Sequence, residues 1–548
     1  MTKLFFKYFN ILFIAILLII GLSIYKDFGI SIDEKINRVN GLVNLKFLYN
    51  FFSFNHLNET LFKNIPDLNS WGDRYYGAFL EVLNILFVEI FLNTKNYSEI
   101  YFTRHILNHA LFLFSLYFFY LICFNIFKNK YLSYFGVILL YTTPRIFAHS
   151  FYNSKDLAFL SIFVIAIYFS IKSFKNLNYR NSLMLALTSA LAMNIRIVAI
   201  YIPFLFSFFV LIDCLIKNTL IKYKLKYLLI IIFLNIIIFL ISYPFLWEEP
   251  LKKFLEIFVL FSDFKRMDFL EVFYFGNFYK SSNLPWHYLF GIFFATVPVL
   301  ITIFGLLGIF FTIKRLVKRL FSIDKDKNYN DIWRSDKEKI ILYNFFLIFI
   351  PLFASILINS VIYNGWRHFY FLYPLFIIQL IYSLNFLMTY YKKIISNKII
   401  IFFCLVILSN NIFSIIKMHP YQHSYFNILF EKKANQLFQI DYWGVANTDA
   451  LKKILKLDSD KKVYRVASAS FVDLHLSKIM LGEKESKKIV ILGQNYDNAE
   501  YVFNNFNYEV NTDFDDKYKI PSEFKKFFEI RRGNILINEV YKRKNLNK

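Results

Sequence analysis

Long apolar runs follow one another along most of the chain, and short polar segments separate them. A helix that crosses a bilayer needs about 20 mostly apolar residues, so runs of this length predict spanning helices. The pattern predicts about eleven spans, near residues 4–25, 104–127, 131–148, 157–174, 181–194, 197–216, 227–245, 288–313, 340–361, 368–390 and 399–417. The fifth run is short, and Arg196 separates it from the sixth. The pattern therefore favours an all-α polytopic membrane protein.

The polar segments between the predicted spans differ in their content of basic residues. Cytoplasmic loops of membrane proteins collect Lys and Arg. Placing Lys3 and Lys7 in the cytoplasm puts every dense basic segment there, namely residues 128–130, 172–180, 217–226, 314–339 and 392–398. The opposite side then receives 26–103, 149–156, 246–287, 364–367 and the tail from about 418. We therefore expect a bacterial inner (plasma) membrane protein with a cytoplasmic N-terminus and a periplasmic or extracellular C-terminal domain.

Two apolar segments need separate interpretation, namely residues 77–93 and the first predicted span. Residues 77–93 are apolar but carry Glu81 and Glu89, which favours an interfacial helix over a span. The first span is longer than a signal peptide's apolar region, and no small-residue cleavage site follows it, so we expect it to be retained. The chain thus divides into a membrane domain, 1–417, with a large first external loop, 26–103, and a C-terminal part, 418–548.

The C-terminal part becomes polar and alternating from about Asn447 onward. Asn447 is a predicted N-cap of a helix that reaches about Leu457. Alternation predicts short strands at 462–468 and 487–493, and a hairpin at 527–542 that turns at residues 532–534. A small α/β domain outside the membrane follows from this pattern.

Composition agrees with a membrane protein. The 548 residues are 57% hydrophobic and only 19% charged, whereas soluble domains hold about 25% charged residues. The net charge of +24 is explained by the basic loops and by a Lys-, Ile- and Asn-rich composition, and no nucleic-acid-binding motif accompanies it. The three cysteines lie far apart inside apolar runs, so neither a disulfide framework nor a thiolate metal site follows: Cys123, Cys214 and Cys404.

Charged residues near membrane spans are the candidates for chemistry, because hydrophobicity excludes them elsewhere. Asp33 and Glu34 follow the first span, and a carboxylate there can act as a general base toward an acceptor hydroxyl. The alternative is a pair of solvated loop acids. The segment 143–156 concentrates five polar groups of mixed chemistry in a turn between spans: Arg145, His149, Asn153, Lys155 and Asp156. A helix would place most of them on one face, and this favours a functional cavity over a polar turn wetted by headgroups.

Further candidates lie at other span ends. Arg196 and Arg367 can each bind a lipid phosphate, or merely reach the interface with their side chains. His368 follows Arg367, and Trp286 and His287 form an aromatic entry into a span that can line a sugar or lipid pocket or simply anchor at the interface. Beyond the last span, His419 and His423 have helical spacing, but Pro420 intervenes and no third ligand is evident, so we expect no metal site.

Taken in chain order, these motifs resemble the GT-C superfamily of polyprenyl-phosphate-sugar-dependent glycosyltransferases. The likeness is to the family-39, protein mannosyltransferase-like branch, and to the lipid A aminoarabinose transferases. The matching segments cover about three quarters of the chain and are Asp33-Glu34, 144–156, 192–196, 243–250, 284–288, 366–368 with Pro374, 419–427 and 441–444. The resemblance extends the expected fold to a GT-C-like helical domain.

The resemblance implies an inverting transfer of a hexose or pentose on the non-cytoplasmic face, within cell-envelope glycan metabolism. The donor would be a polyprenyl-phosphate sugar and the acceptor a lipid-linked, glycan or protein hydroxyl; the tail lacks the β-trefoil insert of eukaryotic protein mannosyltransferases, which argues against a protein acceptor. No cofactor is implied, and a divalent cation is left open. The implied catalytic residues are Asp33, Glu34 and Asp156. The implied ligands of the donor phosphate are Arg196, Arg367, Arg145 and Lys155, and the implied pocket residues are His149, Asn153, Trp286, His287, His368 and Tyr421.

Two other classes compete with this interpretation. A lipid or glycan transporter also has many spans, but it usually shows inverted repeats and Gly- or Pro-broken helices near the midplane. The two halves of this chain do not resemble each other in hydropathy. A lipid-linked glycan polymerase or ligase would be expected to depend on a large central external loop. The acidic pair after the first span and the charges gathered on one side favour the transferase.

Overall fold

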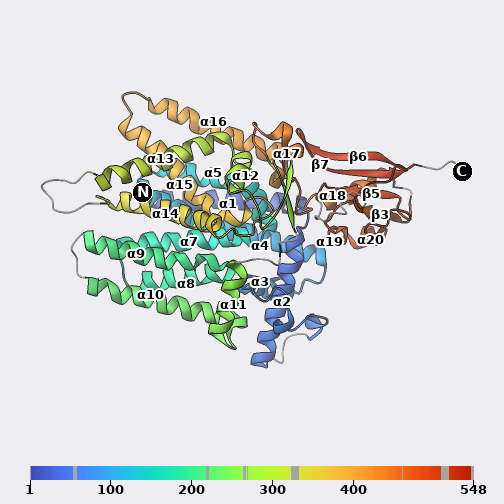
Figure 1. Cartoon of the computed structure of the whole chain (residues 1–548), viewed down its shortest axis with the longest axis horizontal. Helices are drawn as coiled ribbons and strands as arrows, with labels where there is room; N and C mark the ends of the chain where they lie inside the picture. The colour runs from blue at the N-terminus through green and yellow to red at the C-terminus, as the bar shows by residue number, and fades with distance from the viewer. Residues whose placement is uncertain are drawn as a thin grey trace.

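The protein is described from a computed structural model that covers residues 2–53, 59–216, 221–262, 267, 270–321, 332–459, 461–507 and 517–544. The helices that build the bundle and its edges are α1 (Thr2–Ile24), α2 (Ile32–Phe52), α3 (Phe79–Ile85), α4 (Tyr97–Phe127), α5 (Lys130–Thr142), α6 (Pro144–Tyr152), α7 (Asp156–Lys175), α8 (Tyr179–Ile195), α9 (Tyr201–Ile216), α10 (Ile221–Ile241), α11 (Pro250–Ser262), α12 (Tyr288–Thr296), α13 (Val299–Phe321), α14 (Asp336–Leu357), α15 (Tyr373–Tyr390) and α16 (Asn397–Met418). Figure 1 shows most of them running side by side along the long axis.

Eight helices among the described residues are long and apolar enough to cross a membrane, or nine if the bent pair formed by α1 and α2 counts as one span. The chain is thus an integral membrane protein, but the expectation of about eleven spans is too high. The predicted span 131–148 breaks at Pro144, which begins α6 and leaves α5 with only 13 residues. The predicted span 181–194 becomes α8, whose 17 residues fall short of the usual length of about 20. The side chains of Lys3 and Lys7, which were used to predict the orientation, are outside the described part of the structure.

The bend after the first span positions the N-terminus of α2. The two helices meet at 103°, so α2 leaves the direction of α1 almost at a right angle. Ser31 and Glu34 form a capping box, in which the Glu34 carboxylate accepts a hydrogen bond of 2.8 Å from the Ser31 backbone N–H. Such a cap satisfies N–H groups that the first turn leaves unpaired, and it fixes the turn that carries Asp33.

The region 77–93 forms α3 and the π-helix η4 (Leu86–Phe91). Glu81 is paired with the fully buried Arg104 of α4, and Glu89 with Arg38 of α2 at 2.5 Å. The two acidic residues that argued against a span therefore pair with basic residues of neighbouring helices.

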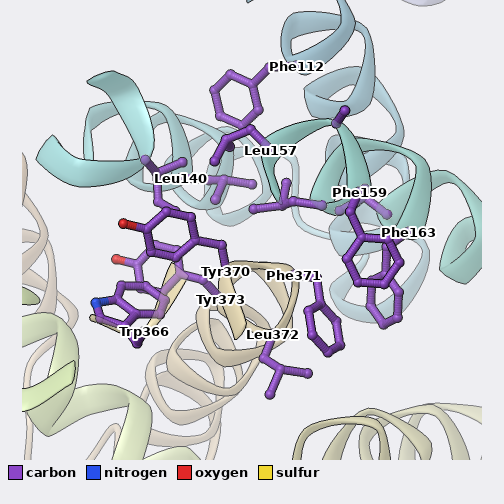
Figure 2. Close-up of a cluster of buried hydrophobic side chains, with 14 of the residues drawn as sticks. Phe112, Leu140, Leu157, Phe159, Phe163, Trp366, Tyr370, Phe371, Leu372 and Tyr373 are labelled. Atoms are coloured by element: carbon purple, nitrogen blue, oxygen red, sulfur yellow. The ribbon is translucent and has the colours of Figure 1, made fainter. Parts of the chain in front are cut away.

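The core of the bundle lies between α7 and the segment that leads into α15. The 3-10 helix η8 (Arg367–Leu372) places Phe371 against Phe159 and Phe163 of α7, with ring centroids 4.8 and 5.0 Å apart. Figure 2 shows this aromatic and aliphatic cluster, with Trp366 and Tyr370 beside it. Because η8 begins with Arg367, its packing holds that arginine at the start of a buried segment.

The C-terminal part forms α17 (Ala434–Leu437), α18 (Asn447–Leu457), α19 (Leu474–Ile479), α20 (Glu483–Ser486), β3 (Tyr464–Ser468), β4 (Ile489–Ile491), β5 (Tyr501–Asn504), β6 (Phe524–Arg532) and β7 (Ile535–Arg543). Their sheet has the order β4-β3-β5-β7-β6, in which β3 is parallel to β4 and β5 while β7 is antiparallel to β5 and β6. The predicted helix and hairpin are confirmed, and Gly533 makes the hairpin turn with a φ of +54°. The predicted N-cap is wrong by one position, because Asn447 is the first helical residue and the N-cap is Ala446, which has no side chain that can cap. The alternation did not predict β5, because its four residues are all buried.

The C-terminal sheet lies at one end of the helical bundle (Figure 1). A second, two-stranded sheet was also not predicted: β1 (Glu271–Tyr274) pairs antiparallel with β2 (Asn277–Lys280) in the segment before α12. Tyr274 also forms an isolated bridge with Phe438, so this hairpin is joined to the chain that leads into the C-terminal domain.

Candidate active site

A cavity of about 370 Å³ collects most of the charged residues predicted to act. This volume lies in the range of small-molecule sites, about 300–1,000 Å³. Its charged and histidine lining consists of Asp33, Asp73, Lys155, Arg196, Arg367 and His368. Segments that lie far apart in sequence therefore meet around one space.

Asp33 is the second residue of α2 and faces this cavity. Its side chain is 32% exposed, and one carboxylate oxygen accepts a hydrogen bond of 3.1 Å from Nη1 of Arg367. The capping box of Ser31 and Glu34 flanks Asp33 and fixes its backbone, so the carboxylate is held at the wall but remains accessible.

Glu34 differs from Asp33, because its carboxylate is buried against other residues. It is fully buried, and besides the cap it contacts Nε2 of His105 at 3.0 Å. Glu34 is not among the described residues that line the cavity. Its contacts assign it to holding α2 on α4, so the carboxylate of the acidic pair that can meet a substrate is Asp33.

Asp156 lies behind the cavity wall and binds both arginines. Its carboxylate accepts from Nη1 of Arg367 at 3.0 Å and pairs with Nη2 of Arg196. Asn153 holds it from the other side, since the amide donates to the carboxylate at 3.1 Å and the amide oxygen accepts from the Asp156 backbone N–H at 2.7 Å. The side chain is 1% exposed, so Asp156 can orient the arginines but does not meet the cavity directly.

The two arginines keep donors that no protein group uses. Nε of Arg196 and Nε of Arg367 are buried and make no hydrogen bond within the described part of the chain. The Arg367 guanidinium lies 5.1 Å from the ring centroid of Tyr363 and 5.0 Å from that of Trp443, and such cation–π contacts stabilise a desolvated cation. Burial raises the pKa of Tyr363 although Arg367 opposes this. Unused N–H donors on fixed cations suit an anionic ligand.

Lys155 adds a third cation to the cavity wall. Its Nζ lies 2.9 Å from the ring centroid of Tyr76. Burial and then the nearby Arg196 lower the pKa of Lys155 well below its usual value. A buried amine beside other cations becomes fully charged more easily when an anion arrives.

Several predicted residues are buried behind the cavity and do not line it. Arg145 donates from Nε to the Tyr425 carbonyl at 3.1 Å, and its guanidinium lies over the Phe426 ring. His149 is paired with Asn153 at 3.1 Å and lies near the Tyr442 hydroxyl at 3.4 Å; burial and then His423 lower the pKa of His149. Arg145 and His149 therefore hold the 144–156 segment in place through contacts with buried residues of the protein.

Three other predicted pocket residues lie elsewhere. Trp286 is 70% exposed, and His287 is hydrogen-bonded to the Tyr274 hydroxyl at 3.0 Å. Tyr421 donates to Asp449 at 2.6 Å. None of the three is among the described residues that line the cavity, whereas His368 is.

The structure also adds residues that the sequence reasoning did not select. Asp73, Tyr75 and Tyr76 come from the segment between α2 and α3 and line the cavity. Trp443, far along the chain, contacts Arg367. The segment containing Trp443 belonged to the motif set, but only the fold shows what its side chain contacts.

The described residues include no group of three or more His, Cys, Asp or Glu side chains that could hold a metal ion. His419 contacts Asp27 at 2.8 Å, and His423 contacts Asp441 at 3.0 Å. The two histidines thus have separate partners.

No profile of a protein family matches the chain, and no curated protein matches it in sequence. Among solved structures, the chain is similar to the crystal structure of ArnT from Cupriavidus metallidurans bound to undecaprenyl phosphate, with 10% identity and a TM-score of 0.47 over 97% of this chain and 98% of that one. It is also similar to ArnT of the same organism in the apo state, with 9% identity and a TM-score of 0.43 over the same shares of the two chains.

Proposed function

We propose that the protein is an inverting glycosyltransferase that moves a sugar from a polyprenyl-phosphate carrier to an acceptor hydroxyl. The observation that carries the proposal is that Asp33, Lys155, Arg196 and Arg367 line one cavity. A transfer of this kind needs a base for the acceptor and cations for the departing phosphate, and the cavity holds both.

The cations supply the phosphate side of the reaction. The Nε donors of Arg196 and Arg367 are used by no described residue, and Asp156 fixes both guanidinium groups from behind. Fixed donors stabilise the charge that develops on the leaving phosphate oxygen as its bond to the anomeric carbon breaks. Lys155 has a lowered pKa in the free protein, and the bound phosphate would favour its charged form.

Asp33 supplies the acceptor side. Its carboxylate takes the proton of the acceptor hydroxyl, whose oxygen attacks the anomeric carbon as the bond to the phosphate breaks. Attack opposite to the leaving group inverts the configuration. In the free protein Arg367 binds both Asp33 and Asp156; a donor phosphate competes for this guanidinium and leaves Asp33 available as the base.

The remaining wall suits the lipid part of the donor. Apolar side chains of α11, α14 and the segment after α14 line the cavity beside the cations, including Ile257, Phe261, Pro351, Ile358 and Phe369. We propose a bacterial inner membrane location with a cytoplasmic N-terminus, which places the cavity and the C-terminal domain at the non-cytoplasmic face. The acceptor is proposed to be a lipid-linked molecule, a glycan or a protein, and the sugar a hexose or pentose.

The test is transfer from labelled polyprenyl-phosphate sugars in membranes that contain the wild type, Asp33→Asn or Asp27→Asn. Asp27 is a matched control because it lies six positions earlier and its carboxylate, about half exposed, pairs with His419 instead of lining the cavity. Loss of a general base typically lowers the rate by about 10²–10⁴-fold. We expect that loss in Asp33→Asn alone; equal activity in all three proteins would remove Asp33 as the base. Movement of an intact lipid-linked sugar without new glycosidic bonds would instead identify a transporter.

A further inference from the structure

The C-terminal sheet has an edge of the kind that binds ligands in other α/β domains. Its strands β4, β3 and β5 are parallel, and β3 lies between the other two. The chain therefore leaves β3 to one side for β4 and then crosses to the other side for β5. Ligands of open α/β sheets bind at the carboxyl ends of strands where the order reverses in this way.

In this protein a segment of the same chain lies against that edge. Asn505 and Asn507 directly follow β5, and their side-chain amides donate to the carbonyls of Asp441 at 3.1 Å and Tyr442 at 3.0 Å. All four residues are buried. The C-terminal sheet thus binds the backbone of the 441–444 turn by two hydrogen bonds at the edge where other α/β sheets bind ligands.

The turn is also fixed from within. The Asp441 carboxylate accepts backbone N–H groups of Val445 at 3.1 Å and Ala446 at 3.0 Å, and it contacts Nε2 of His423 at 3.0 Å. Gly444 has a φ of +66°, a conformation that other residues adopt only with strain. A turn fixed at both ends can transmit the position of the domain to whatever its side chains touch.

The side chain and the carbonyl of Trp443 reach two parts of the active site. The indole ring lies 5.0 Å from the Arg367 guanidinium and 4.9 Å from the His149 ring. The carbonyl accepts a hydrogen bond of 3.2 Å from the backbone N–H of Ile32, which immediately precedes Asp33. One residue therefore contacts both the arginine assigned to the phosphate and the first turn that carries the base.

We infer that the C-terminal sheet is a clamp for the active site: through Asn505 and Asn507 it holds the 441–444 turn, and Trp443 of that turn acts as a positioning residue for Arg367 and Asp33. The effect on catalysis rests on the proposed function, while the clamp itself is a statement about local stability. The clamp gives the C-terminal sheet a role in transfer that acts through the turn.

The first experiment compares Asn505→Asp with Asn498→Asp. Aspartate keeps the size of Asn505 and its acceptor oxygen but removes the amide donor to the Asp441 carbonyl. Asn498 is an exposed asparagine of the same domain and serves as the matched control. Hydrogen exchange is measured on peptides covering 29–38 and 363–372, together with kcat and donor KM. We expect faster exchange in both peptides and a fall in kcat/KM of about five- to thirtyfold in Asn505→Asp alone.

A second pair of variants separates positioning from folding. Trp443→Phe keeps an aromatic face toward Arg367 and the backbone carbonyl, whereas Trp443→Leu keeps only the carbonyl. Loss of a buried cation–π contact is expected to raise donor KM about five- to thirtyfold in Trp443→Leu, and Trp443→Phe should restore most of it. This pair decides the question if Asn505→Asp does not fold.

The possible failures are distinguishable. Exchange in 29–38 and 363–372 that is the same in Asn505→Asp and Asn498→Asp overturns the clamp, whatever reaction the protein catalyses. Equal donor KM in Trp443→Leu and Trp443→Phe overturns the role of the indole ring. If the wild type transfers no sugar from any polyprenyl-phosphate donor, the proposed function fails while the exchange measurement still decides the clamp.

Discussion

Replacing Asp156 by asparagine tests whether this buried carboxylate holds Arg196 and Arg367, the two arginines proposed to bind the donor phosphate. The substitution keeps the shape of the side chain but removes the charge that Arg196 and Arg367 share. Breaking a buried ion pair costs about 3–5 kcal/mol because it leaves an uncompensated charge. We expect about 3 kcal/mol, the lower end, since Arg367 keeps Asp33 as a partner and the Arg196 side chain is 20% exposed.

The same change has opposite effects on donor binding and on turnover. Two cations without their counter-ion attract a phosphate at least as well, so donor KM should stay level or fall. The guanidinium groups are no longer oriented, and a misplacement of about 1 Å can lower the rate on the order of a hundredfold. Polyprenyl phosphate at a hundred times its Kd stabilises a protein by about 2.7 kcal/mol, which would offset most of the loss in Asp156→Asn.

The assay is thermal unfolding of the purified protein in nanodiscs, with and without polyprenyl phosphate, together with transfer kinetics. Asp27→Asn is the control, because its partly exposed pair with His419 should contribute only about 0–1 kcal/mol. A variant that unfolds at the wild-type temperature would refute the idea that Asp156 holds the arginines. A large rise in donor KM would refute the assignment of these arginines to the phosphate.

Three further predictions concern the surroundings of the cavity. Burial and Arg196 lower the pKa of Lys155, and a bound phosphate would raise it, so donor binding takes up a proton. Donor Kd measured across a pH series should therefore rise as pH rises above that lowered pKa toward the ordinary value of about 10.4. Lys155→Met should flatten this slope. Replacing His105 by phenylalanine removes a partner of the buried Glu34 and should lower the free energy of unfolding by about 1–3 kcal/mol in denaturant titration; a neutral result would show that the cap alone satisfies Glu34. Gly29→Ala places a methyl group against the Val445 carbonyl oxygen and should cost about 1–3 kcal/mol and reduce kcat, whereas Gly482→Ala, which meets nothing within 4 Å, should unfold like the wild type.

The sequence singled out charged residues that lie beside an apolar run. Asp33 after the first span, Arg196 between two runs and Arg367 at the start of a span stood out for this reason, and the structure brings all three to one cavity. Arg145 and His149 gave the same signal, yet they are buried behind the wall, where Arg145 binds a backbone carbonyl. Hydrophobic patterning shows that a polar group is unusual at a position; it does not show whether a ligand or the protein's own backbone satisfies it.

Some elements of the fold were predicted from the sequence, and the prediction of others failed for related reasons. The helix from Asn447 was predicted although its N-cap is Ala446 and no side chain caps it. The hairpin around Gly533 was predicted because turn chemistry determines it. The break at Pro144 was not, although proline at the first turn of a helix is a known start signal, because the apolar run continues through it. Similarly, β5 is buried at every position, so it lacks the alternation by which a strand is recognised.

The position of Asp156 explains why the strongest acid–base candidate is the more exposed carboxylate. Both Asp33 and Asp156 bind Nη1 of Arg367, but Asp156 is 1% exposed and Asp33 is 32% exposed. Three cations around one cavity would repel one another in the absence of a donor, and a permanent counter-ion must therefore be part of the protein. Asp156 fills this role because Asn153 and both arginines occupy its oxygens. Within the described part of the chain, the Asp33 carboxylate accepts one hydrogen bond, from Arg367. In the proposed reaction the arriving phosphate competes for this cation, so Asp33 is the carboxylate that donor binding would release to take a proton.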